Sequence, residues 1–412
     1  MNPTPDAPPT PDAPPTPDAP PAPAPPVSSP EEHAARVAAL AGAHAGRAEA
    51  AHTPHPEVVD AVTAAGFAGH FVPPPFGAPG RTFAQLKRAA AVIGAACPAT
   101  AWCAVLAALM ARTAGFLPPE GRKRLWADGP DTLVAGGVAP RGRAVGTDGG
   151  WTLSGSWPSV TAAEHAAWFL LAAEVTEGPE PGPRVFVVPR SAVRVERTWD
   201  DLGMRATGSH TAVVEEVFVE APLSFPYARL AEIDDPPPGP DGRPVPLLAV
   251  NTFVFCLPML GAARGLLHRW TGLIGAKLQA REAAYDPLVA HYADVFARSS
   301  GEIDAAELVL DRVARLIDAA PQVGRADVAR NQRDCAFAAG LLVGAADRLM
   351  RASGSGGHST GGDLQRLWRD LHTAGAHMAL QFGPAAAGYA REFLRPEATR
   401  FTEPAPSTDP VR

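Results

Sequence analysis

The stretch GGWTLSGSWPSVTAAEHAAWFLLAA, residues 149–173, decides the fold class of this chain. Its first half alternates apolar and small polar side chains, and from residue 166 it becomes a short apolar run. Both patterns are typical of β-strands. Four similar runs, separated by Gly, Pro and Asp, lie between residues 131 and 232. So many short strands in about 100 residues predict a compact barrel or sandwich, and we expect a central β-barrel at 131–232.

Helical periodicity is found on both sides of this β segment. Residues 30–130 repeat apolar, largely alanine positions every three to four residues, which predicts an N-terminal helical domain. Residues 247–396 hold four long apolar-periodic segments with polar connections, which predict a C-terminal four-helix bundle. The proline-rich segment 233–246 is predicted to be a linker. The expected protein is therefore mostly α-helical, with a β domain in the middle.

The two ends of the chain have compositions that do not form a core. PTPDAP occurs three times from residue 3, so residues 1–29 are predicted to be a disordered or polyproline-II tail. Residues 397–412 are predicted to be a polar tail. The N-terminus lacks the basic and apolar regions of a signal peptide, and we find no apolar run of about 20 residues. We therefore predict no membrane span and a cytoplasmic location.

Charge, cysteine spacing and glycine motifs exclude several functions. The net charge is −7 and no Lys/Arg-rich run is present, which argues against a nucleic-acid partner. The four cysteines form no CxxC and no cluster with zinc spacing, so we expect free buried thiols and no metal site. Neither GxGxxG nor GxxxxGK[ST] occurs, which excludes a Rossmann or P-loop nucleotide site.

The C-terminal segment RLWRDLHTAGAHMALQFG, residues 366–383, carries two histidines in a helical pattern. His372 and His377 are five residues apart, which turns them by about 140° on one helix. They cannot share a face as a metal pair would. We expect His377 to face a buried site and His372 to lie on the bundle surface or at a subunit contact. Arg369 and Asp370 are predicted to be structural.

Three stretches together resemble the acyl-CoA dehydrogenase superfamily. They are residues 149–173, TWDDLGMRATGSHTAVVEEVFVEAP (198–222) and LQRLWRDLHTAGAHMAL (364–380). The order of a helical unit, a β unit and a bundle agrees with that superfamily, and the resemblance covers residues 35–395. It implies the acyl-CoA dehydrogenase-like fold and a homotetramer, in which a neighbouring chain often completes the flavin site.

The last of these stretches favours the monooxygenase branch. Residues 371–381 contain no acidic residue where many acyl-CoA dehydrogenases carry their catalytic glutamate. Instead His377 follows W-R-D-x-x-T-x-x-x-H, which is similar to the flavin-dependent monooxygenases of this fold, such as the oxygenase component of 4-hydroxyphenylacetate hydroxylase, dibenzothiophene monooxygenase and the amino-sugar nitroso synthases.

That branch implies a two-component enzyme. A separate NAD(P)H:flavin reductase would supply FADH2 or FMNH2, which reacts with O2 through a C4a-hydroperoxyflavin. The product would be a hydroxylated small aromatic, polycyclic or amine substrate. Bacterial catabolism or natural-product and antibiotic biosynthesis is the expected setting.

The resemblance also implies roles for individual residues. His377 would be a base or proton shuttle, since histidine titrates near neutrality. Thr161, aligned on Trp157, would take the position of a serine near flavin N5. The alternative is a strand threonine that caps a bulge. Cofactor contacts are expected from Trp157, Ser159, Thr161, Thr207, Gly208, Ser209 and His210.

The helix ATAWCAVLAALMART, residues 99–113, is expected to line the substrate site through Trp102, Leu106 and Met110. Its apolar character indicates a bulky, hydrophobic substrate, although Trp102 and Met110 could equally be core residues. Two other functions stay open: an FAD-dependent acyl-CoA dehydrogenase, and a flavin-free relative that binds a ligand or partner. The sequence does not separate C-hydroxylation from N- or S-oxidation.

Overall fold

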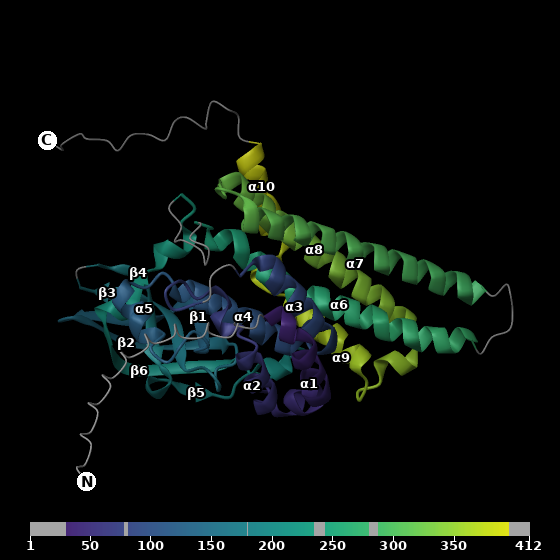
Figure 1. The fold of residues 1–412 in the computed structure, drawn as a ribbon, viewed down its shortest axis with the longest axis horizontal. Coiled ribbons are helices and arrows are strands. Elements are labelled where there is room, and N and C mark those ends of the chain that lie inside the picture. The colour runs from purple at the N-terminus through teal and green to yellow at the C-terminus, as the bar shows by residue number, and fades with distance from the viewer. Residues whose placement is uncertain (1–29, 78–80, 179, 235–243, 280–286, 395–412) are drawn as a thin grey trace, which may run out of the picture.

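The computed structural model describes residues 30–77, 81–178, 180–234, 244–279 and 287–394. The predicted tails at 1–29 and 397–412, and most of the predicted linker, lie outside the described residues. The chain forms a group of N-terminal helices, a twisted sheet and a long helical bundle, with most of the N-terminal helices between the other two (Figure 1).

Among the described residues, five helices and one 3₁₀ turn precede the sheet. They are α1 (Pro30–Ala51), α2 (Pro56–Ala64), η1 (Ala68–Phe71), α3 (Phe83–Ala96), α4 (Pro98–Ala114) and α5 (Pro119–Leu125). Helix α3 begins at a capping box, in which Thr82 and Gln85 satisfy each other's backbone N–H groups. Helices α2, α4 and α5 begin with proline, whose missing N–H is not needed in a first turn.

Seven strands form one mixed sheet. They are β1 (Val134–Thr147), β2 (Gly150–Val160), β3 (Trp168–Glu177), β4 (Gly182–Pro189), β5 (Arg194–Glu196), β6 (His210–Glu220) and β7 (Ser224–Pro226). Their order is β5-β6-β2-β1-β3-β4-β7. The prediction of a closed barrel is therefore wrong, and the sheet is open. Its edge strands β5 and β7 have three residues each and do not pair with each other. Without that pairing the sheet cannot close.

Trp157 anchors the end of strand β2. Its side chain is fully buried, and its indole Nε1 donates a hydrogen bond to Ala172 O on β3 at 2.7 Å. Two glycines, Gly142 on the neighbouring strand β1 and Gly155 on β2 itself, make room for the ring, since a Cβ would lie 2.3 Å and 2.7 Å from it. The anchor fixes the backbone just before Thr161.

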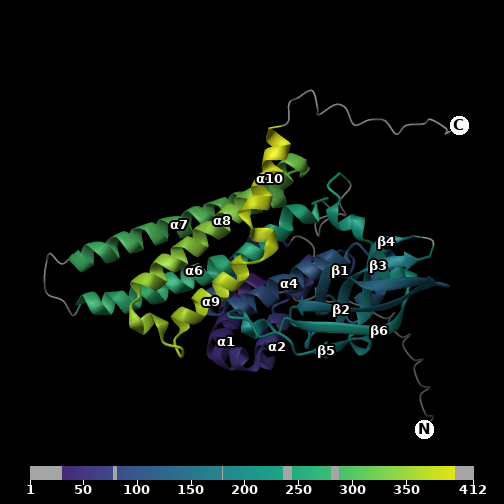
Figure 2. The same cartoon turned by 180° about the vertical axis from the view of Figure 1, so that it is seen from behind.

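The bundle is built around one long apolar helix. Its elements are α6 (Leu247–Gln279), α7 (Pro287–Ala319), α8 (Arg325–Ala352), η6 (Ser355–His358), α9 (Asp363–Gly375), η7 (Met378–Leu380) and α10 (Phe382–Phe393). By length and composition α6 could cross a membrane, but 83% of its most apolar window is buried inside the fold. It packs against α3, α4, α7, α8 and α9, as the two views show (Figures 1 and 2). Helix α6 is therefore the central helix of a packed core.

The two predicted histidines of the last segment do not share a helix. Helix α9 ends at Gly375, and His377 is the N-cap of η7, so the 140° argument does not apply to this pair. His372 Nε2 is 2.9 Å from Asp347 Oδ1 on α8, and its ring is partly exposed. The break in the helix leaves His377 free to take a direction of its own.

Candidate active site

A cavity of about 460 Å³ lies where the N-terminal helices, the sheet and the bundle meet. Its walls come from α2, α4, the start of β1, the segment after β2, the loop before β6, α6 and the segment around His377. Eight of the predicted site residues line it: Trp102, Leu106, Met110, Ser159, Thr161, Thr207, Ser209 and His377. Residues predicted for cofactor, substrate and catalysis are thus brought together.

Three hydroxyl groups form a continuous row along the sheet side of this cavity. Thr161 Oγ1 is 3.0 Å from Ser209 Oγ, and Ser209 Oγ is 2.7 Å from Thr207 Oγ1. At one end, Trp102 Nε1 donates to Thr161 Oγ1 at 3.3 Å. At the other end, Thr207 Oγ1 donates to the carbonyl oxygen of Met204 at 2.8 Å. We call Thr161, Ser209 and Thr207 the hydroxyl row.

The partners at its two ends give the hydroxyl row one direction. A carbonyl oxygen only accepts and an indole N–H only donates. The proton of Thr207 is therefore committed to Met204 O, so Ser209 must donate to Thr207 and Thr161 must donate to Ser209. Thr161 Oγ1 accepts from Trp102 and keeps one acceptor position. Toward the cavity, the hydroxyl of Thr161 acts as a hydrogen-bond acceptor.

The backbone of the hydroxyl row is held in an unusual conformation. Ser159 and Ala162 both have positive φ, 59° and 54°, which is uncommon for residues other than glycine. Ala162 N donates to Thr207 O at 2.9 Å, which ties the segment after β2 to the loop before β6. Backbone strain of this kind persists only where the surrounding structure enforces it, and it is concentrated at functional sites.

The carbonyl group of Met204 joins this loop to the bundle. It accepts from Thr207 Oγ1 and also from Trp199 Nε1 at 2.9 Å. The N–H of Met204 donates to Asp370 Oδ1 on α9 at 2.6 Å. Burial raises the pKa of Asp370 to about 6, although the Met204 hydrogen bond and Arg366 favour its charged form. Asp370, which the sequence predicted only as structural, thus fixes the end of the hydroxyl row.

Three residues predicted to contact the cofactor do not line the cavity. The side chain of Trp157 is buried in the β-domain core, so it positions Thr161 and makes no contact with the cavity. Gly208 packs against the α1–α2 connection, where a Cβ would lie 3.2 Å from both Thr53 and Pro54. His210 is buried behind the row, and its Nδ1 accepts from Trp199 N at 3.2 Å.

His377 lies beside two stacked aromatic rings at the cavity wall. Its ring centroid is 4.2 Å from that of Phe255 and 5.9 Å from that of Trp102. Its Nδ1 accepts a hydrogen bond from Ala379 N at 3.2 Å. Burial lowers the pKa of His377, so the ring is neutral at neutral pH. A neutral imidazole that accepts at Nδ1 carries its proton at Nε2.

Several lining residues were not predicted from the sequence. Phe255 of α6 stacks on Trp102 with ring centroids 5.3 Å apart, and α2 contributes Val58, Val59 and Val62. These residues belong to ordinary apolar helical patterns, which do not distinguish a cavity wall from a core. Among the described lining residues none is Lys or Arg, and the carboxylate of Asp201 is solvent-exposed.

Comparisons with known proteins agree with this architecture. A family model described as acyl-CoA dehydrogenase, C-terminal domain, matches residues 253–382. The chain is 30% identical over 335 residues to a pigment production hydroxylase of Rhodococcus sp. (strain ATCC 21145), covering 77% of this chain and 82% of that protein. It is 29% identical over 297 residues to the flavin-dependent monooxygenase oxygenase subunit HsaA of Rhodococcus jostii, covering 70% and 78%.

A solved structure extends the comparison to the whole fold. XiaF from Streptomyces sp., in complex with FADH2 and glycerol, superposes with a TM-score of 0.80 and 26% sequence identity. The match covers 89% of this chain and 94% of XiaF.

Proposed function

We propose that this chain hydroxylates a bulky, uncharged aromatic substrate. The proposal starts from its family: the chain belongs to the flavin-dependent monooxygenases with the acyl-CoA dehydrogenase fold. It is an oxygenase component, and reduced flavin is its cofactor. The observation that carries the proposal is the directed hydroxyl row, which ends at Thr161 in the same cavity as His377.

The residues of the cavity fit a reduced flavin. Thr161 offers a hydrogen-bond acceptor, and reduced flavin has an N–H at N5 that oxidised flavin lacks. Trp102 and Phe255 offer flat apolar surface for a ring system. Thr161, Ser209 and Thr207 would hold the flavin, as the resemblance implies. When bound, reduced flavin supplies the activation of O2 from which one oxygen atom is transferred to the substrate.

His377 holds a proton at Nε2, where the ring can donate a hydrogen bond. In this tautomer Nε2–H would donate a hydrogen bond to an oxygen atom of a molecule bound in the cavity. Acting as a base at Nε2 would require the other tautomer, which gives up the Ala379 hydrogen bond at a cost of about 0.5–1.5 kcal/mol. We therefore assign His377 the role of a neutral hydrogen-bond donor at Nε2. The apolar rings around it exclude water from this proton.

The cavity walls indicate the substrate class. The absence of Lys and Arg among the described lining residues leaves a carboxylate group of a substrate without a cationic partner. Leu106, Met110 and the valines of α2 present apolar surface that suits a polycyclic ring. The same walls argue against an acyl-CoA dehydrogenase, because the described lining offers no buried carboxylate base. Antibiotic biosynthesis or catabolism is the setting in which we place such a substrate.

Self-association is part of the proposal. Helix α10 has no buried residue, and it exposes Phe382 and Phe393, which are 49% and 41% accessible. Phe337 of α8 is 50% exposed and lies beside Phe382, with ring centroids 6.4 Å apart. Exposed aromatic groups of this kind mark interaction sites. We propose that copies of this chain pack through α8 and α10 as a homotetramer, in the cytoplasm, with a diffusing flavin reductase as the second component.

The decisive experiment uses anaerobic protein loaded with FADH2 or, separately, FMNH2. The loaded protein is mixed with oxygenated buffer, with and without indole, and with indole-3-acetate as a charged counterpart. We expect flavin reoxidation slower than that of free flavin, low release of hydrogen peroxide, and hydroxylation of the neutral ring in preference to the carboxylate. Reoxidation identical to free flavin, together with no binding of reduced flavin, would indicate the flavin-free relative. Yellow protein that is bleached by acyl-CoA would indicate the dehydrogenase.

A further inference from the structure

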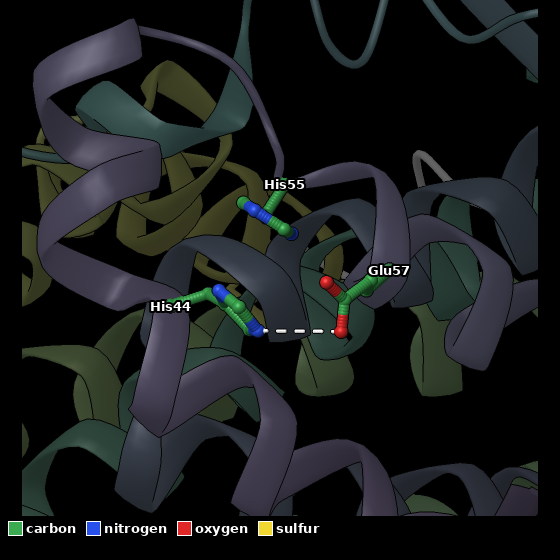
Figure 3. Close-up of side chains that lie close together, drawn as sticks. All are labelled: His44, His55 and Glu57. Carbon is green, nitrogen blue, oxygen red and sulfur yellow. Dashed lines mark ion pairs between the residues drawn. The ribbon is translucent and has the colours of Figure 1, made fainter.

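A cluster of two histidines and one glutamate lies at the junction of α1 and α2, outside the cavity (Figure 3). His44 is in the third turn from the end of α1, His55 is the N-cap of α2, and Glu57 is in the first turn of α2. One ligand atom from each side chain lies within 4.8 Å of the others. This cluster was not predicted from the sequence, because the spacing of its residues matches no zinc motif and the packing of α1 against α2 brings them together.

The three side chains already face one another. His44 Nε2 is 3.6 Å from Glu57 Oε2, and Figure 3 shows the carboxylate at the edge of the two imidazole rings. The rings of His44 and His55 are stacked, with centroids 3.8 Å apart and an angle of 17° between their planes. His55 makes no capping hydrogen bond to α2, so its ring is not held by the helix it precedes.

We propose that His44, His55 and Glu57 bind one divalent transition-metal ion, with Zn²⁺ as the first choice. Two imidazoles and one carboxylate are a donor set that zinc takes in proteins, with a water molecule in the fourth position. The side chain of Glu57 is 65% exposed, so water reaches the open position. Imidazole ligands also suit Cu²⁺ and Ni²⁺, whereas Mg²⁺ and Ca²⁺ prefer a set of oxygen ligands.

Binding requires one small rearrangement. Stacked rings direct their lone pairs in parallel, so one ring must turn about its Cβ–Cγ bond before both nitrogens reach the same ion. That torsion is soft for histidine. The Nδ1 atoms of both rings are buried and have no hydrogen-bond partner among the described residues. Since such second hydrogen bonds raise affinity by about 10- to 100-fold, we expect micromolar affinity, weaker than that of a structural zinc site.

The metal ion would link α2 to α1, and α2 forms one wall of the cavity. Pro54, Val58 and Val59, from the connection and from α2, line the cavity. Thr53 Oγ1 is 3.3 Å from His165 Nε2, at the segment that follows Thr161. A metal ion that bridges α1 and α2 would therefore hold the α2 wall in place from its outer side.

The test uses the full chain without a histidine tag, freed of metal by a chelator and then dialysed. Zn²⁺ alone is titrated calorimetrically, and Co²⁺ alone is followed by its visible absorption, which is intense for four-coordinate ions. We expect one ion per chain. His55→Gln and Glu57→Gln should each weaken binding by at least about tenfold. The electron paramagnetic resonance spectrum of bound Cu²⁺ should report two nitrogen ligands, and one in His55→Gln.

His291→Gln is the matched control, because His291 is an exposed histidine on α7 outside the cluster. It should bind Zn²⁺ as the unchanged chain does, and circular dichroism checks that each variant is folded. No stoichiometric binding of Zn²⁺, or equal losses in His55→Gln and His291→Gln, would overturn the proposal. Unchanged affinity for Zn²⁺ in folded His55→Gln would also overturn it.

Discussion

Replacing Thr161 by Val tests the direction of the hydroxyl row. The substitution keeps a β-branched side chain of similar shape and removes only the hydroxyl. In the unchanged chain this oxygen accepts from Trp102 Nε1 at 3.3 Å and donates to Ser209 at 3.0 Å. Its remaining acceptor position is the one that we assign to the N–H of reduced flavin.

The size of the effect follows from one hydrogen bond. A net hydrogen bond contributes about 0.5–1.5 kcal/mol, which corresponds to about 2- to 13-fold in a dissociation constant. Reduced flavin should bind to Thr161→Val more weakly by this factor. Oxidised flavin lacks the N–H at N5, so its dissociation constant should change little. The expected result is therefore a change in the ratio of the two constants.

Both constants are measured by flavin fluorescence and absorbance, anaerobically for FADH2 and in air for FAD. Thr161→Ser is the matched control, because it keeps the hydroxyl and should keep the ratio. Melting curves of both variants establish that they are folded. A ratio in Thr161→Val equal to that of the unchanged chain would refute the acceptor assignment, and so would a Thr161→Ser variant that behaves like Thr161→Val.

Three other substitutions have predictable outcomes. His377→Asn should lower hydroxylated product by about 10²-fold or more and raise peroxide release, with flavin affinity unchanged, as measured by single-turnover product and peroxide assays. The pKa of Asp370 is raised to about 6, so the folded state favours the neutral carboxyl group. The contribution of Asp370 to the free energy of unfolding therefore falls as pH rises from about 4 to about 6. Asp370→Asn should therefore gain stability relative to the unchanged chain over that window, by up to about 3 kcal/mol in urea unfolding; a pH-independent difference would contradict this. Ala162→Gly should raise the melting temperature slightly, because relief of a left-handed conformation, about 1–2 kcal/mol, exceeds the entropic cost of glycine, about 0.5–1 kcal/mol. The neighbouring Ala163→Gly should lower it, and two equal shifts would show that φ at 162 is not strained.

The sequence predicted the kinds of secondary structure but not how the sheet ends. The alternation in 150–160 and the apolar run after 166 are local signals, and both became strands. Whether the sheet closes depends on its edges, β5 and β7, which are three residues long and lie far apart in the sheet. A local sequence pattern cannot show whether β5 and β7 pair with each other. The sequence therefore predicted a barrel where the structure has an open sheet.

The apolar periodicity of the sequence also did not predict that helix α9 ends at Gly375. Residues 364–383 keep an apolar spacing that continues across the break, and the sequence therefore predicted one helix carrying both His372 and His377. In the structure the backbone turns at Ala376, and His377 begins a new 3₁₀ turn in which its own Nδ1 accepts from Ala379 N. This hydrogen bond sets the tautomer of His377, the proposed hydrogen-bond donor.

Some residues of the site were predicted from sequence motifs, whereas other contacts of the site form only when the chain folds. Thr161 and His377 were named from short stretches, and both line the cavity. The direction of the hydroxyl row depends on Met204, whose carbonyl group accepts from Thr207 and whose N–H is held by Asp370, 166 residues away. Without that anchor the hydroxyl protons could reverse, and Thr161 would become a donor toward the cavity. The preference for reduced flavin that we expect is thus a property of a helix and a loop that meet only in the folded chain, and a variant at Asp370 should weaken it without touching the cavity.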